Sequence, residues 1–102
     1  MYSIGYDLGS SSIKVALIDS ATGKSIKTVQ EPAQEMEILA LHSDWAEQSP
    51  ETWWEHICKA TRDIIKDTGV DKNLITAIGI SYQMHGLVLI DKKGKTLRNA
   101  II

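Results

Sequence analysis

The chain has 102 residues, of which 43% are hydrophobic and 24% are charged, and its formal net charge is -2. This composition fits about one globular domain, and the slight negative charge argues against nucleic acid as a partner. No apolar run approaches the roughly 18 residues that span a bilayer, and no basic segment leads into an apolar stretch as in a secretion signal. We therefore expect a cytoplasmic protein without a membrane partner. A single cysteine, Cys58, excludes an internal disulfide.

Three short strands are predicted at the start of the chain, over residues 2–8, 12–19 and 25–30. Apolar and polar residues alternate along them, and clusters of turn-forming residues separate them. Strands joined by turns this short pair antiparallel. The sequence thus predicts an antiparallel meander.

The first of these turns has the composition of a site for phosphate and a metal ion. Asp7 and Gly9 open the turn. Three hydroxyl side chains and a cation follow, namely Ser10, Ser11, Ser12 and Lys14. Glycine adopts backbone angles closed to other residues and leaves room for a ligand, consecutive N–H groups and hydroxyls donate to phosphate, and a carboxylate binds Mg²⁺. The alternative is a plain polar turn, because Asp, Gly and Ser favour turns for local reasons.

A strand follows this turn, whereas a Walker loop and a dinucleotide fingerprint both lead into a helix. The site therefore differs in kind from both of those nucleotide motifs.

A helix is predicted to begin at Pro50 and to continue until Gly69. Ser49 suits the N-cap, proline suits the first helical position, and apolar residues recur at helical spacing. Trp53 and Trp54 lie within this pattern and are interpreted as packing residues, because aromatic residues at helical spacing usually belong to a core.

The segments on either side of the helix complete the predicted α/β architecture. Residues 31–49 carry no clear period, so we expect an irregular segment there with Trp45 as its anchor. Residues 74–81 are almost continuously apolar, which favours a central strand covered on both faces. A further strand is expected over residues 87–90.

Gln83, Met84 and His85 interrupt the apolar pattern where the strand over residues 74–81 ends. Ligands of open α/β sheets often lie beyond strand ends of this kind. An imidazole exchanges hydrogen bonds with a hydroxyl group, and a thioether packs on an apolar surface. The alternative for His85 is a structural histidine whose hydrogen bonds are satisfied within the fold.

The turn from Asp7 to Ser11 resembles the first phosphate motif of the superfamily that contains actin, sugar kinases and heat-shock ATPases. Two further segments follow it in the order found in the FGGY carbohydrate kinases, and most closely in their xylulose kinases. Residues 45–54 are similar to the Trp-x-Glu-Gln-x-Pro-Glu-x-Trp-Trp stretch of that family, and residues 83–86 match its Gln-Met-His-Gly stretch. The resemblance extends from residue 2 to about residue 100.

This resemblance implies that residues 1–102 are an incomplete N-terminal part of a ribonuclease H-like, actin-like ATPase domain with a mixed sheet. It implies ATP and Mg²⁺ as cofactors, with Asp7 supporting the metal and the glycine, serines and lysine of the turn beside the phosphates. It places Gln83, Met84 and His85 against a small-molecule sugar. The implied reaction transfers the γ-phosphate of ATP to a hydroxyl of a ketose, with xylulose as the expected acceptor.

The chain departs from the family pattern at two residues, of which Tyr82 leaves the acceptor open among xylulose, ribulose, gluconate and glycerol. Ser10 stands where the family usually has Thr, and Tyr82 stands where xylulose kinases commonly have Gly. The family's general-base aspartate is expected downstream of Ile102. The chain alone is therefore expected to be inactive and to form homo-oligomers through uncovered apolar surface.

Two other functions stay open. A non-catalytic module that binds a sugar or a protein is compatible with the same elements, because a fold does not fix a function. A chaperone or filament ATPase is disfavoured by residues 83–85, because those families need no small-sugar pocket.

Overall fold

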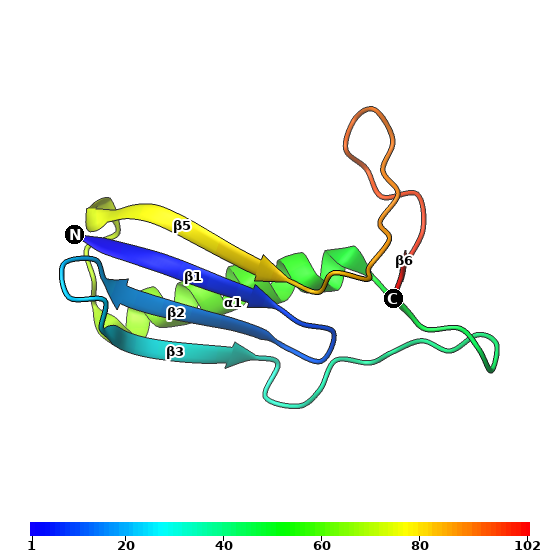
Figure 1. Ribbon diagram of the computed structural model, residues 1–102, viewed down its shortest axis with the longest axis horizontal. Helices are drawn as coiled ribbons and strands as arrows, with labels where there is room; N and C mark the ends of the chain where they lie inside the picture. Colours follow the sequence, from blue (N-terminus) through cyan, green and yellow to red (C-terminus); the bar gives the residue numbers. More distant parts are fainter.

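The computed structural model describes all 102 residues, as two sheets and one long helix (Figure 1). The main sheet has the order β3-β2-β1-β5. Its strands are β1 (Tyr2–Leu8), β2 (Ile13–Asp19), β3 (Ser25–Glu31) and β5 (Ile75–Tyr82). β1–β2 and β2–β3 pair antiparallel, whereas β1 and β5 pair parallel. The predicted meander and the mixed sheet are both confirmed, with strand ends within one residue of those expected.

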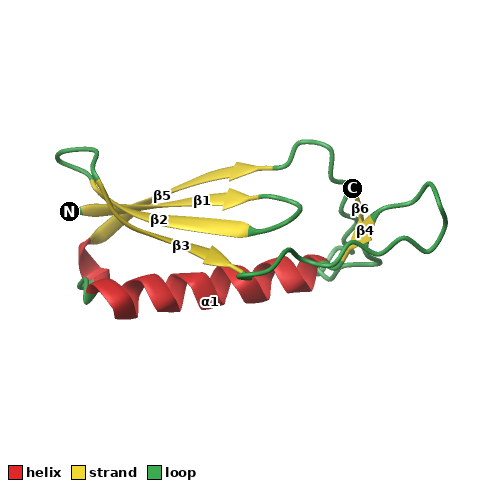
Figure 2. Cartoon of the chain, turned by 90° about the horizontal axis from the view of Figure 1, so that it is seen from below, coloured by secondary structure: helices red, strands yellow, loops and turns green.

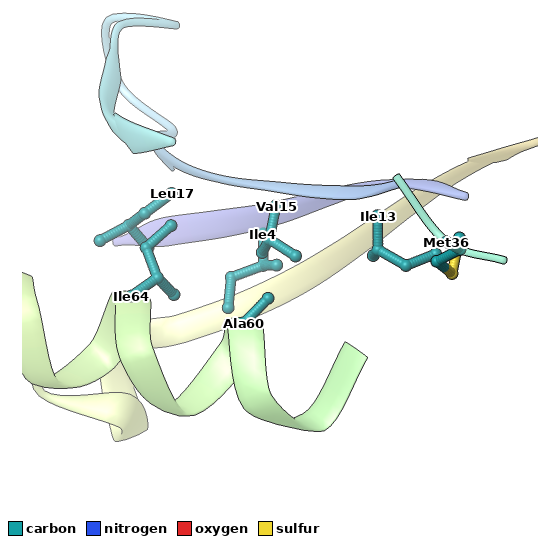
Figure 3. Packing of buried hydrophobic residues seen from close by; sticks show 7 residues of the cluster. All are labelled: Ile4, Ile13, Val15, Leu17, Met36, Ala60 and Ile64. Carbon is teal, nitrogen blue, oxygen red and sulfur yellow. The ribbon is translucent and has the colours of Figure 1, made fainter. Parts of the chain in front are cut away.

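Helix α1 (Pro50–Thr68) lies along one face of this sheet and leaves the other face without a covering helix (Figure 2). Successive strand residues point to opposite faces, so the apolar residues of β2 meet the helix while Lys14 and Ala16 face away from it. Figure 3 shows Ala60 and Ile64 of α1 pointing toward the strands. The buried core cluster comprises Ile4, Ile13, Val15, Leu17, Met36, Ala60 and Ile64.

The ends of α1 follow the sequence closely. Gly69 adopts the left-handed conformation at φ 65, which favours glycine, and its N–H donates to the carbonyl of Ile65. Ser49 occupies the N-cap position, but its hydroxyl donates to the Glu51 carboxylate at 3.0 Å and makes no capping bond to the backbone. No helix of the chain is both long and apolar enough to cross a membrane.

β5 is an edge strand, so the prediction of a central strand covered on both faces is wrong for this chain. Seven of its eight residues are exposed. β5 pairs only with β1, and α1 packs against β2 and β3 and so leaves β5 largely uncovered. An apolar groove of about 450 Å³ runs between β5 and the helix. Its apolar lining includes Trp54, Ile57, Cys58, Ile78 and Ile80.

The packing role predicted for the tryptophans is confirmed only for Trp53, which packs against the core. Trp54 is 66% exposed in the groove beside β5, and Trp45 is 49% exposed with its ring against His42. Met36 anchors the segment over residues 31–49 instead, because its side chain closes one end of the core (Figure 3).

The second sheet joins segments on either side of the helix. β4 (Glu47–Gln48) pairs antiparallel with β6 (Ala100–Ile101). The strand expected over residues 87–90 is wrong, since Leu87 and Ile90 form only isolated bridges. A short 3-10 helix, Lys72–Leu74, leads into β5.

Side-chain contacts tie residues 96–98 to the start of α1. The Thr96 hydroxyl donates to Glu51, and this bond lowers the pKa of the Glu51 carboxyl below its ordinary value. Arg98 forms an ion pair with the buried Glu47 carboxylate.

Leu17→Ala should lower the free energy of unfolding by about 2–5 kcal/mol, because it leaves a cavity in the core between β2 and α1. Urea denaturation followed by circular dichroism measures the change. Leu41→Ala is the matched control, since Leu41 is 67% exposed, and its effect should stay within about 0.5 kcal/mol. Equal losses in the two variants would contradict the core assignment.

The chain should self-associate through β5, which presents unpaired backbone groups and apolar side chains along a free edge. Ile80→Lys should reduce the associated fraction, because a lysine on an edge strand hinders pairing with a second strand. Light scattering after gel filtration measures the mass. Ile26→Lys on the opposite edge strand β3 is the control and should leave the mass unchanged.

Candidate functional site

The candidate site lies at the end of the sheet where the carboxyl ends of β1 and β5 lie side by side. Because the two strands run parallel and pair in register, with Leu8 opposite Tyr82, their carboxyl ends meet there (Figure 1). The Gln83 N–H donates to the Leu8 carbonyl at 2.9 Å and extends the pairing by one bond. The turn over residues 9–12 and the segment over residues 83–85 are thus brought together from distant parts of the sequence.

The backbone of the turn leaves three N–H groups without a protein acceptor, although Ser12 itself is only 9% exposed. The Ser12 carbonyl accepts from the Gly9 N–H at 3.0 Å, and the Ser11 carbonyl accepts from the Met36 N–H at 2.8 Å. The N–H groups of Ser10, Ser11 and Ser12 donate to no protein acceptor. Consecutive free N–H groups in a turn form a concave site for an anion. The turn therefore has free N–H groups where the sequence predicts a phosphate site, and that site stays a prediction.

Gly9 is required for space and not for unusual backbone angles, which corrects the sequence-based argument. Only Gly23, Gly69 and Gly94 have positive φ angles. A Cβ added at Gly9 would lie 3.1 Å from the Ser12 carbonyl oxygen, the acceptor that closes the turn. A side chain here would push that carbonyl away.

Asp7 and Lys14 lie opposite each other on paired strands, on the face of the sheet that α1 leaves bare. Both are exposed, and Asp7 forms no ion pair. They line a shallow depression of about 360 Å³ together with Gly5, Thr28, Gly79 and Ser81. No three His, Cys, Asp or Glu side chains gather to bind a metal. Asp7 is the one carboxylate that lines this depression, and a single carboxylate suits Mg²⁺ that is held mainly by phosphate oxygens and water.

The three residues expected to contact a sugar differ in their surroundings. Gln83 is half-buried and lines a pocket of about 140 Å³ with Trp53 and Tyr82. Met84 is 81% exposed, and His85 is exposed as well. The alternative of a structural histidine whose hydrogen bonds are satisfied within the fold is not supported, because the His85 side chain is exposed and bonds to no protein group. The structure brings Gln83 beside the phosphate turn and leaves Met84 and His85 free for a ligand.

Glu47 and Gln48 belong to the family-like stretch over residues 45–54, and the sequence leaves open whether they pack or bind; each is only 3% exposed. Glu47 pairs with Arg98 through one carboxylate oxygen, and its other oxygen has no partner. The Gln48 amide donates to the Ser10 carbonyl within the turn. Two polar residues directly before a helix carry no periodic signal, so only the three-dimensional structure reveals that they are buried.

A family model for the N-terminal domain of the FGGY family of carbohydrate kinases matches residues 2–102. The chain belongs to this family. The xylulose kinase of Staphylococcus epidermidis is 35% identical to this FGGY chain over 99 residues, which are 97% of the chain and 19% of that protein. The chain thus spans about a fifth of the length of this relative.

Solved structures agree with the FGGY assignment. The crystal structure of a xyloylose kinase from Brucella ovis matches with a TM-score of 0.89 and 31% identity, over 100% of this chain and 21% of that one. A gluconate kinase from Lactobacillus acidophilus matches with a TM-score of 0.83 and 27% identity, over 98% and 19%. The fold is therefore part of the actin-like ATPase fold, as the sequence predicted.

Gly9→Ala should destabilise the chain by about 1–3 kcal/mol, because the new methyl group crowds the Ser12 carbonyl. Urea denaturation measures the loss. Gly79→Ala is the control: a Cβ there meets nothing within 4 Å, so stability should be unchanged or slightly raised. If Gly9→Ala is as stable as wild type, the turn does not need the space that glycine leaves.

Proposed function

We propose that this FGGY chain is the N-terminal part of a longer ATP-dependent sugar kinase, here called the parent enzyme. The observation that carries the proposal is that β1 and β5 end side by side, so that free N–H groups of the turn after β1 lie beside Gln83. A phosphate donor and a sugar acceptor must be neighbours for a phosphoryl group to pass between them. Family membership supports the same reaction class.

ATP is proposed to bind with its phosphates at the turn. The N–H groups of Ser10, Ser11 and Ser12 have no protein acceptor, so they can donate to phosphate oxygens without breaking an existing bond. The cation of Lys14 lies on the adjacent strand, opposite Asp7. Asp7 would hold Mg²⁺ directly or through its waters, because its carboxylate is exposed and unpaired. The metal would neutralise charge on the phosphates during transfer.

The sugar is proposed to bind against residues 83–85. His85 would exchange hydrogen bonds with a sugar hydroxyl, and Met84 would pack against the carbon chain. Xylulose is the proposed acceptor, because Gln83-Met84-His85-Gly86 matches the stretch found in xylulose kinases and a xylulose kinase is among the relatives. Gluconate is the second candidate, because a gluconate kinase has a similar fold. Tyr82, which is 71% exposed beside this segment, would influence that choice.

The chain alone is proposed to be inactive. Phosphoryl transfer needs a base or an orienting carboxylate at the acceptor hydroxyl, in a site closed to water. The depression beside Asp7 is shallow, and the residues at the sheet edge are exposed. The remaining groups and the closing surface would come from other parts of the parent enzyme.

The parent enzyme should release ADP from Mg-ATP when xylulose is added. Two substitutions should distinguish the proposed metal and phosphate part of the site from the proposed sugar part. Asp7→Asn should lower kcat by about 10²–10³-fold, because it removes the charge that supports the metal. His85→Ala should raise the KM for xylulose about tenfold with a smaller effect on the KM for ATP, because one hydrogen bond to the sugar is lost. A coupled ADP assay measures both, with ribulose, gluconate and glycerol as competing acceptors.

Asp67→Asn and His42→Ala are matched controls on exposed positions outside the site, and both should behave as wild type. If gluconate supports faster turnover than xylulose, the acceptor is corrected and the kinase assignment stands. Absence of ADP release with every acceptor, together with sugar binding by calorimetry, would replace the kinase by a non-catalytic binding module.

A further inference from the structure

We propose that Gln48 is a positioning residue for the phosphate turn, acting through the Ser10 carbonyl. Its side-chain amide orients the peptide that carries the Ser11 N–H, and so keeps a phosphate donor pointed at the ligand. This inference rests on the proposed function, because it gives the turn a phosphate to hold. Gln48 itself would touch neither ATP nor the sugar.

The Gln48 side chain is fixed by its surroundings. It is buried, and its backbone is held where β4 pairs with β6 opposite Ala100. Its Oε1 accepts from the Trp53 indole Nε1 at 2.9 Å. An indole nitrogen only donates, so the amide oxygen must face Trp53 and the amide NH₂ must face Ser10. The Ser10 carbonyl is therefore held by a donor that has one permitted orientation.

The geometry of the peptide bond transmits this contact to the ligand side of the turn. In a planar trans peptide the C=O and the N–H point in opposite directions. Because Gln48 holds the Ser10 carbonyl from the protein side, the Ser11 N–H must point away from the protein. Met36 constrains the next peptide, since its N–H donates to the Ser11 carbonyl at 2.8 Å and the Ser12 N–H of that peptide therefore points away from Met36.

Gln48 is the only side chain that holds the backbone of the turn. The Met36 and Gly9 contacts are backbone bonds, which a substitution does not remove. Gln48 also donates to the Glu37 carbonyl at 3.5 Å, next to Met36. One amide thus links the turn, the segment that carries Met36, and the first turn of α1 through Trp53. Orientation of the free N–H groups is therefore sensitive to this one residue.

Gln48→Glu in the parent enzyme tests the proposal, because it keeps the shape of the side chain and replaces the amide donor with an ionisable oxygen. The ionised glutamate still accepts from Trp53, but it offers the Ser10 carbonyl a negative oxygen and no proton. At about pH 8 we expect kcat/KM for Mg-ATP to fall on the order of 10- to 100-fold, with the KM for the sugar nearly unchanged.

Lowering the pH should restore activity in this variant. Burial raises the pKa of a carboxyl, and a protonated glutamate can donate to the Ser10 carbonyl again. The ratio of variant to wild-type kcat/KM should therefore rise as the pH falls from about 8 toward 6. Gln48→Ala should show the loss without this recovery. Gln34→Glu, on an exposed glutamine, should show neither effect.

Amide hydrogen exchange gives a readout that does not depend on catalysis. In Gln48→Glu at about pH 8, exchange at the Met36 amide should accelerate, because the turn that supplies its acceptor is loosened, while exchange in the middle of α1 should not. Unchanged exchange at Met36, or a loss of activity that is the same at every pH, would overturn the proposal. Wild-type protein without sugar-dependent ADP release would instead overturn the proposed function and leave the exchange experiment to decide the role of Gln48.

Discussion

The parallel pairing of β1 with β5 is the constraint on which the candidate site depends. Between these strands the chain forms β2, β3, an irregular segment that contains β4, and a 19-residue helix, yet β1 and β5 match residue for residue from Ser3 to Leu8. Because their directions agree, both chain exits lie at one edge of the sheet, and the Gln83 N–H closes the pair onto Leu8. An antiparallel β5 would send residues 83–85 to the opposite edge. The chemistry proposed for the two segments would then have no common location.

Helix α1 makes that parallel pairing possible. Parallel neighbours need a long crossover, and the helix both returns the chain to the start of the sheet and covers one of its faces. Its buried residues Ala60 and Ile64 pack on β2, whose outward residues are left bare of any helix. The same packing decides the position of Lys14 and, through the pairing of β1 with β2, that of Asp7. One apolar core therefore sets which face of the sheet is available to a ligand.

Local patterns predicted the elements well, and the pairing of distant elements poorly. The meander and the limits of α1 follow from alternation, turn residues and the glycine at position 69, all of which act within a few residues. The apolar run of β5 predicts a covered central strand, because apolar composition indicates that a strand favours burial but does not show which element covers it. The packing role predicted for Trp54 is wrong for the same reason, since Trp54 lies beside β5 in the open groove. Residue types alone predict a phosphate site at the turn, whereas the orientation of its N–H groups depends on the hydrogen bonds that Met36 and Gln48 donate to its carbonyls.

The buried polar residues of β4 show why the second sheet matters to the first. A buried carboxylate is costly unless it is paired, and Glu47 has one oxygen paired with Arg98 and one without a partner. The buried Glu47 carboxylate is retained only if the surrounding structure holds it in place. The pairing of β4 with β6, the strand that follows residues 87–99, does so. The backbone of Gln48, the next residue, is held by the same strand pairing, and its side chain donates to the Ser10 carbonyl in the turn after β1. The short pairing of β4 with β6 thus connects the segment that follows β5 with the turn that follows β1. Both segments lie at the end of the sheet that carries the proposed site.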